Sequence, residues 1–169
     1  MKKWCKKIVI PLSMLYILMI MGYIPLPKLF TINVSASMPL GIYLLESPED
    51  INRGDIIVFE ADDDVMSIAY ERGWMKPGMH FLKYVYAVGG DVYSIKNGRY
   101  IVNGVDKGAV QKYDSESRTL PSFLHEGDYV VPDGYILTGT PAMNSFDSRY
   151  YGPVSINRVY NKAKYVLGW

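Results

Sequence analysis

The chain has 169 residues and a net charge of +1, which is enough length for one domain with a buried core. A near-neutral chain lacks the basic field of a nucleic-acid-binding protein, so no nucleic-acid partner is expected. The single cysteine, Cys5, excludes an intrachain disulfide.

The first predicted element is a membrane anchor. Residues 8–24 (IVIPLSMLYILMIMGYI) carry no charge. At about 1.5 Å per helical residue, they reach the lower limit for crossing a hydrocarbon core of about 30 Å. Four lysines precede this run, and positive residues stay on the cytoplasmic side. We therefore expect residues 1–30 to form a basic cytoplasmic tip and one transmembrane signal anchor in inner-membrane lipid, with residues 31–169 forming a domain on the outer, periplasmic side.

A cleaved signal peptide is the alternative for the same segment. Val34 and Ala36 would then be the small residues before a cut at Ser37. Signal peptides usually span about 15–30 residues with an apolar core of about 7–15. Here the cut would follow residue 36 and the core would run from residue 8 to residue 24, so the lengths favour an anchor that is not cleaved.

Short strands and turns dominate the rest of the chain. We expect strands at residues 56–60, 79–88 and 156–166, and a helix at 61–75 with Asp62, Asp63 and Asp64 capping its N-terminus. Hairpins are expected to join 92–95 to 100–102 across Asn97-Gly98, and 129–131 to 135–138 across Pro132-Asp133-Gly134. These elements predict a mainly β, antiparallel domain. The three aspartates lack further ligands at useful spacing, so no metal site is expected.

One lysine stands out as a possible base. The only histidines are His80 and His125, and no Ser-His-Asp arrangement is apparent. A lysine can replace the histidine if burial lowers its pKa from about 10.4 towards roughly 7–8. Lys83 shares one face of its predicted strand with Phe81 and Val85. Two interpretations remain open from the pattern: a buried lysine, or an edge lysine whose amine reaches water.

Two serines flank Ala36. If the backbone is extended there, the hydroxyls of Ser35 and Ser37 fall on the same side. One hydroxyl could attack a carbonyl while the other donates to the oxyanion that forms. A polar loop without catalytic function is the alternative.

Three blocks of the sequence, in this order, resemble the membrane-bound signal peptidases of the S26 family, which use a serine/lysine dyad. The blocks are residues 35–39 (SASMP), residues 83–91 (KYVYAVGGD) and residues 144–152 (NSFDSRYYG). The resemblance implies a signal-peptidase-like fold, an antiparallel β catalytic domain behind one N-terminal transmembrane helix. It implies no metal and no cofactor.

The resemblance also implies roles for individual residues. Ser37 matches the nucleophile and Lys83 the general base. Ser35 matches an oxyanion-hole hydroxyl, and Ser145 matches a serine that orients the lysine. Asp147 and Arg149 match a supporting charged pair. The substrate is expected to lie extended beside a strand, and the candidates for a shallow pocket that accepts small side chains are Val34, Phe81 and Leu82.

The sequence departs from ordinary signal peptidases at one block. Gly139 is followed by residues 140–143 (TPAM) in place of the usual G-D-N, and residues 39–43 (PLGIY) and 118–121 (RTLP) look more like the TraF branch. That branch serves conjugative transfer and matures pilin precursors, in some members by closing the pilin into a ring. The expected partner is therefore an exported precursor or prepilin. A housekeeping type I signal peptidase and a non-catalytic membrane-tethered β-domain of a secretion or conjugation assembly are the alternatives.

Overall fold

The computed structural model describes residue 14 and residues 29–169. Among these residues, no helix has the length and apolar character needed to cross a membrane. Apart from residue 14, the predicted anchor at residues 8–24 lies outside the described part of the chain, so it stays a prediction.

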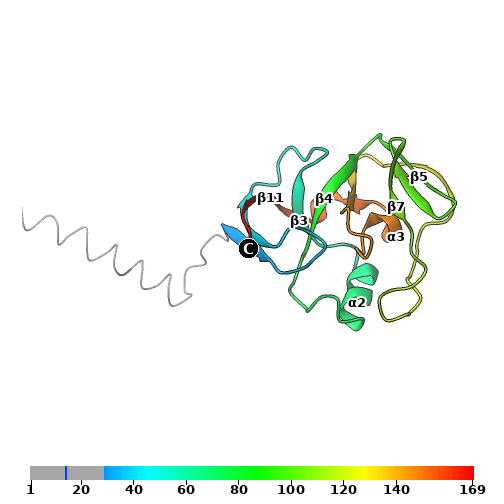
Figure 1. Ribbon diagram of the computed structural model, residues 1–169. Coiled ribbons are helices and arrows are strands. Elements are labelled where there is room, and N and C mark those ends of the chain that lie inside the picture. Colours follow the sequence, from blue (N-terminus) through cyan, green and yellow to red (C-terminus); the bar gives the residue numbers. More distant parts are fainter. Residues whose placement is uncertain (1–13, 15–28) are drawn as a thin grey trace, which may run out of the picture.

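Two antiparallel sheets form the framework of the described chain and confirm the mainly β prediction. The larger sheet has the strand order β1 (Phe30–Asn33), β2 (Gly41–Glu46), β11 (Val159–Leu167), β3 (Ile56–Phe59), β4 (Phe81–Val88), β9 (Tyr135–Gly139) and β10 (Val154–Ser155). The smaller sheet has the order β7 (Val105–Ala109), β6 (Arg99–Val102), β5 (Val92–Lys96) and β8 (Gly127–Val130). In Figure 1 the smaller sheet, marked by β5 and β7, lies on the right, while β3 and β11 of the larger sheet lie on the left.

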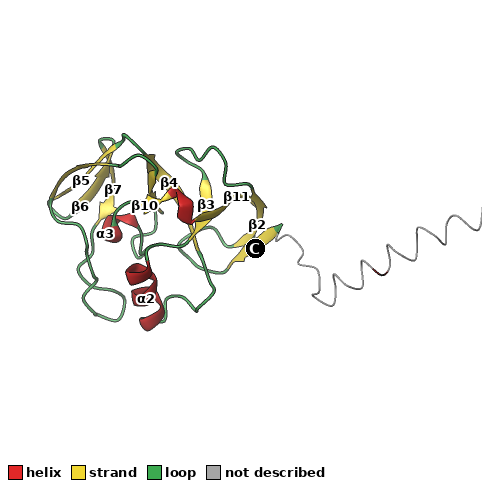
Figure 2. Cartoon of the chain, turned by 180° about the vertical axis from the view of Figure 1, so that it is seen from behind, coloured by secondary structure: helices red, strands yellow, loops and turns green. Residues whose placement is uncertain are grey.

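Short helices complete the domain. They are α2 (Asp63–Glu71), α3 (Ser148–Tyr151) and the 3-10 helix η1 (Ile156–Arg158). Both views place α2 below the strands, and Figure 2 shows it from behind. Its buried residues Val65, Met66 and Ala69 join the main core, which also contains side chains of β3 and β4.

Strand β4 forms as its sequence predicts. Side chains alternate along a strand, and in β4 every second residue from Phe81 to Ala87 is buried while those between are partly exposed. The buried face includes Lys83, which therefore points away from solvent.

Several predicted boundaries need correction, among them those of three elements. Helix α2 is shorter than residues 61–75, and its N-cap residue, Asp62, makes no side-chain capping hydrogen bond, although Asp63 and Asp64 occupy the first turn as expected. Strand β4 begins at residue 81 rather than 79. The last strand begins at residue 159 because Ser155 accepts a hydrogen bond from the Asn157 N–H and holds residues 156–158 in a 3-10 turn.

One predicted hairpin is confirmed and the other is wrong. Asn97 and Gly98 have positive φ angles of 52° and 68° and join β5 to β6. Strand β8, in contrast, pairs with β5, whereas β9 pairs with β4 and β10. The segment Pro132-Asp133-Gly134 therefore carries the chain from one sheet to the other, and the buried side chain of Val131 packs in the second core.

Candidate active site

The loop between β1 and β2 holds the two candidate serines. A turn forms there, so the condition of an extended backbone is not met, and the Met38 N–H donates to the Ser35 carbonyl oxygen at 3.4 Å. The turn brings the Ser35 and Ser37 hydroxyl oxygens to 3.0 Å from each other. The two hydroxyls lie on the same side, but the cause is this turn and not an extended backbone.

Asn33, which was not among the predicted site residues, holds this loop in shape. Its buried Nδ2 lies 2.9 Å from the Ser35 carbonyl oxygen, 3.0 Å from that of Met38 and 3.1 Å from that of Pro39. Its Oδ1 accepts from the Ser35 N–H at 3.1 Å. One side chain therefore fixes the backbone on both sides of Ser37. Its position before a polar turn, where asparagine commonly bonds nearby backbone, was the available signal.

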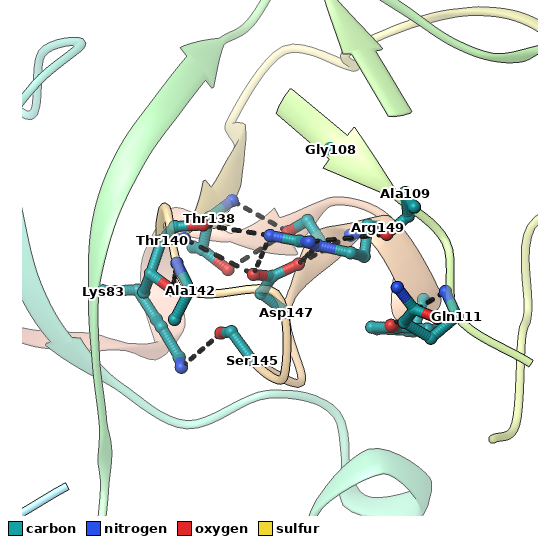
Figure 3. Close-up of polar contacts among 12 residues, drawn as sticks. Lys83, Gly108, Ala109, Gln111, Thr138, Thr140, Ala142, Ser145, Asp147 and Arg149 are labelled. Atoms are coloured by element: carbon teal, nitrogen blue, oxygen red, sulfur yellow. Dashed lines mark hydrogen bonds and ion pairs between the residues drawn. The ribbon is translucent and has the colours of Figure 1, made fainter. Parts of the chain in front are cut away.

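Lys83 reaches the loop from β4. The residue is only 4% exposed, so the interpretation as a solvated edge lysine is wrong. Its Nζ donates to Ser37 Oγ at 3.2 Å and to Ser145 Oγ at 2.8 Å. Figure 3 shows the second of these bonds, with Ser145 on the loop that precedes α3.

Burial makes this amine unusually easy to deprotonate. Desolvation lowers the pKa of Lys83 from 10.5 to about 8, while the negative charge of Asp147 raises it and the positive charge of Arg149 lowers it. At a pKa of about 8, roughly one molecule in ten carries a neutral Lys83 at pH 7. A neutral amine beside a serine hydroxyl can accept that hydroxyl's proton.

Asp147 and Arg149 form a buried ion pair behind the lysine. Arg149 Nε donates to Asp147 Oδ1 at 2.8 Å and its Nη2 donates to Oδ2 at 3.1 Å, with both side chains at most 1% exposed. Figure 3 shows this pair between Lys83 and β7, where Arg149 also donates to the Ala109 carbonyl oxygen at 3.5 Å. The opposite charges partly cancel at Lys83, which leaves burial as the main cause of its shifted pKa.

The segment that departs from the usual signal-peptidase pattern still closes around Ser145. Thr140 is fully buried; its N–H donates to Asp147 Oδ2 at 3.4 Å, and its carbonyl oxygen accepts from Arg149 at 2.9 Å. Ser145 N–H donates to the Ala142 carbonyl oxygen at 3.3 Å. The different residues therefore make a loop that places Ser145 against Lys83.

A cleft of about 830 Å³ opens over these groups. The structure brings seven of the nine predicted site residues to its lining: Val34, Ser35, Ser37, Phe81, Leu82, Lys83 and Ser145. The other two, Asp147 and Arg149, lie buried behind it. A smaller hollow of about 460 Å³ lies on the side of Ser37 formed by residues 36–40. Within the described residues, no group of three histidine, cysteine or acidic side chains could hold a metal ion.

Comparisons with known proteins place the chain in a family. The model of the family described as signal peptidase, peptidase S26, matches residues 1–169. The plasmid transfer protein TraF of Escherichia coli is 29% identical over 147 residues, which cover 82% of each chain. The conjugal transfer protein TraF of Agrobacterium fabrum is 29% identical over 135 residues, which cover 74% of each chain.

Two signal peptidases also match. A probable signal peptidase I-2 of Synechocystis is 28% identical over 128 residues, covering 75% of this chain and 51% of that one. The crystal structure of a signal peptidase I from Enterococcus faecalis matches with a TM-score of 0.38 at 19% identity, over 68% of this chain and 97% of that one. Because the family model spans the whole sequence, the chain belongs to the S26 signal peptidase family, and its similarity to TraF proteins confirms the branch predicted from its sequence.

Proposed function

We propose that this chain is a membrane-bound serine endopeptidase that removes leader segments from exported precursors, with Ser37 as nucleophile and Lys83 as general base. The contact of Lys83 Nζ with Ser37 Oγ at 3.2 Å is the observation that carries the proposal. A buried amine with a pKa of about 8 matches the requirement for a base that works near neutral pH.

In the proposed reaction, neutral Lys83 takes the proton of Ser37 as the serine oxygen attacks the scissile carbonyl carbon. Ser145 keeps the amine directed at Ser37 through its 2.8 Å hydrogen bond. The proton then passes to the leaving amine, and water releases the acyl-enzyme. Attack by the amine of a second segment in place of water would close a ring.

Two donors are available for the oxyanion. They are the Ser35 hydroxyl, 3.0 Å from Ser37 Oγ, and the backbone N–H of Ser37, which lies 3.4 Å from Ser35 Oγ. Both therefore lie beside the attacking oxygen. Losing one such donor typically lowers the rate by about 10²–10³.

An unpaired strand edge offers a place for the substrate backbone. Strand β9 pairs with β4 only from Tyr84 onwards, so Phe81–Lys83 have no strand partner on that side within the described chain. An extended peptide could add to this edge by main-chain hydrogen bonds and direct small side chains towards Val34, Phe81 and Leu82.

The similarity to plasmid and conjugal transfer proteins supports a pilin-like precursor as the substrate. The apolar run at residues 8–24 supports a location in the inner membrane, with Ser37 at its outer surface. The Synechocystis relative supports a housekeeping signal peptidase as a second candidate, which would process many exported proteins instead of one or a few.

The test is the intact mass of a candidate prepilin co-expressed with the full chain. Wild type should shorten the precursor, whereas Ser37→Ala and Lys83→Met should not. Ser67→Ala and Lys76→Met change exposed residues and are the matched controls. A product lighter by one further water indicates ring closure. Normal processing by Ser37→Ala would contradict the proposal.

A further inference from the structure

We propose that the cleft holds a second recognition site, the Trp74 subsite, which binds one bulky apolar side chain of the precursor at a distance from the bond that is cut. The subsite is the part of the cleft lined by Trp74, Met75, Leu120, Phe146 and Tyr150. This inference rests on the proposed peptidase function, since it gives the same cleft a more specific substrate.

The size of the cleft requires more than a small residue to fill it. Its volume of about 830 Å³ is near the upper end of the range of about 300–1,000 Å³ found for ligand pockets. The small side chains expected beside the scissile bond would occupy only the end near Val34 and Phe81. Much of the remaining wall comes from the turn after α2, from the segment 111–120, and from Phe146 and Tyr150.

Trp74 is fixed in place by the way α2 ends. Gly73 has a φ of 70°, its N–H donates to the Tyr70 carbonyl oxygen at 3.0 Å, and the Trp74 N–H donates to that of Ala69 at 2.9 Å. These two bonds form a Schellman motif. A residue set by such a motif presents a preformed surface to the cleft.

Arg72 ties the two walls together. Its guanidinium lies 5.2 Å from the centre of the Trp74 ring, and it donates to Asp114 Oδ2 at 3.3 Å and to the Thr119 carbonyl oxygen at 2.7 Å. Asp114 also accepts from Arg118 at 2.7 Å. The one carboxylate in this part of the cleft lining is therefore paired with arginines, which leaves the subsite suited to an uncharged side chain.

The exposure of the lining points to an apolar occupant. Trp74, Met75 and Leu120 pack on the main core but are only partly buried. Tyr113 and Met143 also line the cleft, and they are 61% and 71% exposed. Exposed apolar surface gathered in one place marks a binding site, and here it is continuous with Ser37. An apolar peptide segment entering the site would cover it.

Tryptophan emission offers a direct test. The chain has three tryptophans, so Trp4→Phe with Trp169→Phe leaves Trp74 as the only one, and Ser37→Ala prevents turnover. The probes are short Ala/Ser peptides with a common scissile bond, in which one Phe occupies successive positions before the bond. We expect one position to shift the Trp74 emission and to bind about tenfold tighter than the parent peptide without Phe.

Matched variants assign the preference to the subsite. Leu120→Asp should reduce the affinity difference between the best Phe peptide and the parent peptide to within about twofold. Val105→Asp places the same charge on an exposed apolar residue of β7 outside the cleft lining and should leave this difference unchanged. If Leu120→Asp does not fold, Leu120→Ala should still lower the preference several-fold.

The outcomes separate this inference from the proposed function. Equal binding of all Phe peptides, with no change in Trp74 emission, overturns the subsite even if wild type cleaves the precursor. Binding that depends on the Phe position and is lost in Leu120→Asp supports the subsite. If such binding is seen but wild type cleaves nothing, the peptidase proposal fails and the subsite stands.

Discussion

Replacing Lys83 with methionine should abolish processing and yet make the fold more stable at neutral pH. Burial lowers the pKa of this amine from 10.5 to about 8, and that difference corresponds to about 3 kcal/mol of cost to the folded state when the amine is protonated. Methionine keeps most of the volume but loses the hydrogen bonds to Ser37 and Ser145, worth about 1 kcal/mol each. The expected net gain is about 1 kcal/mol at pH 7.

The sign of the pH dependence follows from the same pKa values. The folded pKa lies below the unfolded one, so between about pH 8 and 10.5 the unfolded state binds more protons and wild type gains stability as pH rises. The advantage of Lys83→Met should therefore be constant below pH 8 and become a loss of about 2 kcal/mol near pH 10.5.

Urea unfolding of the full chain in a mild detergent, followed by tryptophan emission between pH 6 and 10.5, measures this difference. The decisive quantity is how far the stability difference between Lys83→Met and wild type changes from pH 6 to pH 10.5, and we expect a change of about 3 kcal/mol. A difference between variant and wild type that does not depend on pH would refute the reasoning, because Lys83 would then have an ordinary pKa in the folded protein.

Three further changes test other parts of the site. Asn33→Ala should lower kcat for the precursor by about 10²-fold with little change in KM, because the loop around Ser37 loses its support; an unchanged kcat would show that the loop holds itself. Arg149→Met should lower the free energy of unfolding in urea by about 3–5 kcal/mol, because it leaves Asp147 buried and unpaired. The unpaired Asp147 also raises the pKa of Lys83, so the pH–rate profile should move to higher pH, and adding Asp147→Asn should move it back. A profile that stays in place would contradict this electrostatic coupling. Gly41→Ala should lower the free energy of unfolding by about 1–3 kcal/mol, because the new Cβ would lie 2.2 Å from the backbone carbonyl oxygen of Leu167 in β11. An unchanged melting temperature would show that the two strands do not meet there.

The parts of the fold predicted correctly are those with local causes. Strand β4 follows from alternation, and the β5–β6 hairpin follows from the positive φ angles that Asn97-Gly98 readily adopts. Asn103-Gly104 has the same signal and turns β6 into β7, so this second hairpin was also predictable from the sequence.

Local sequence signals could not predict which strands β8 and β9 pair with. Pro132-Asp133-Gly134 predicts a turn but not the sheet that each flanking strand joins. That choice depends on contacts distant in sequence, such as β8 with β5 and β9 with β4. Strands β1 and β2 were likewise not predicted, although they position the loop that contains Ser37.

At the site, the sequence identified the residue types but left their environment open. The alternation in β4 allowed either a buried or a solvated Lys83. The folded chain buries Lys83 and places its amine against Ser37 and Ser145, which lie 46 and 62 residues away in the sequence. Asn33 carried only the general signal of an asparagine before a polar turn and no sign of catalysis, because its side chain bonds backbone carbonyls.

If neutral Lys83 activates Ser37, the rate of Ser37 acylation must depend on pH. The full chain would be treated with an acylating inhibitor of the β-lactam type from pH 6 to 10, and the modified residue located by mass spectrometry. We expect acylation at Ser37 with a rate that rises about tenfold per pH unit, levels off above about pH 8, and is lost in Lys83→Met. A rate that is flat across this range, or equal acylation of Ser37 in Lys83→Met, would contradict it.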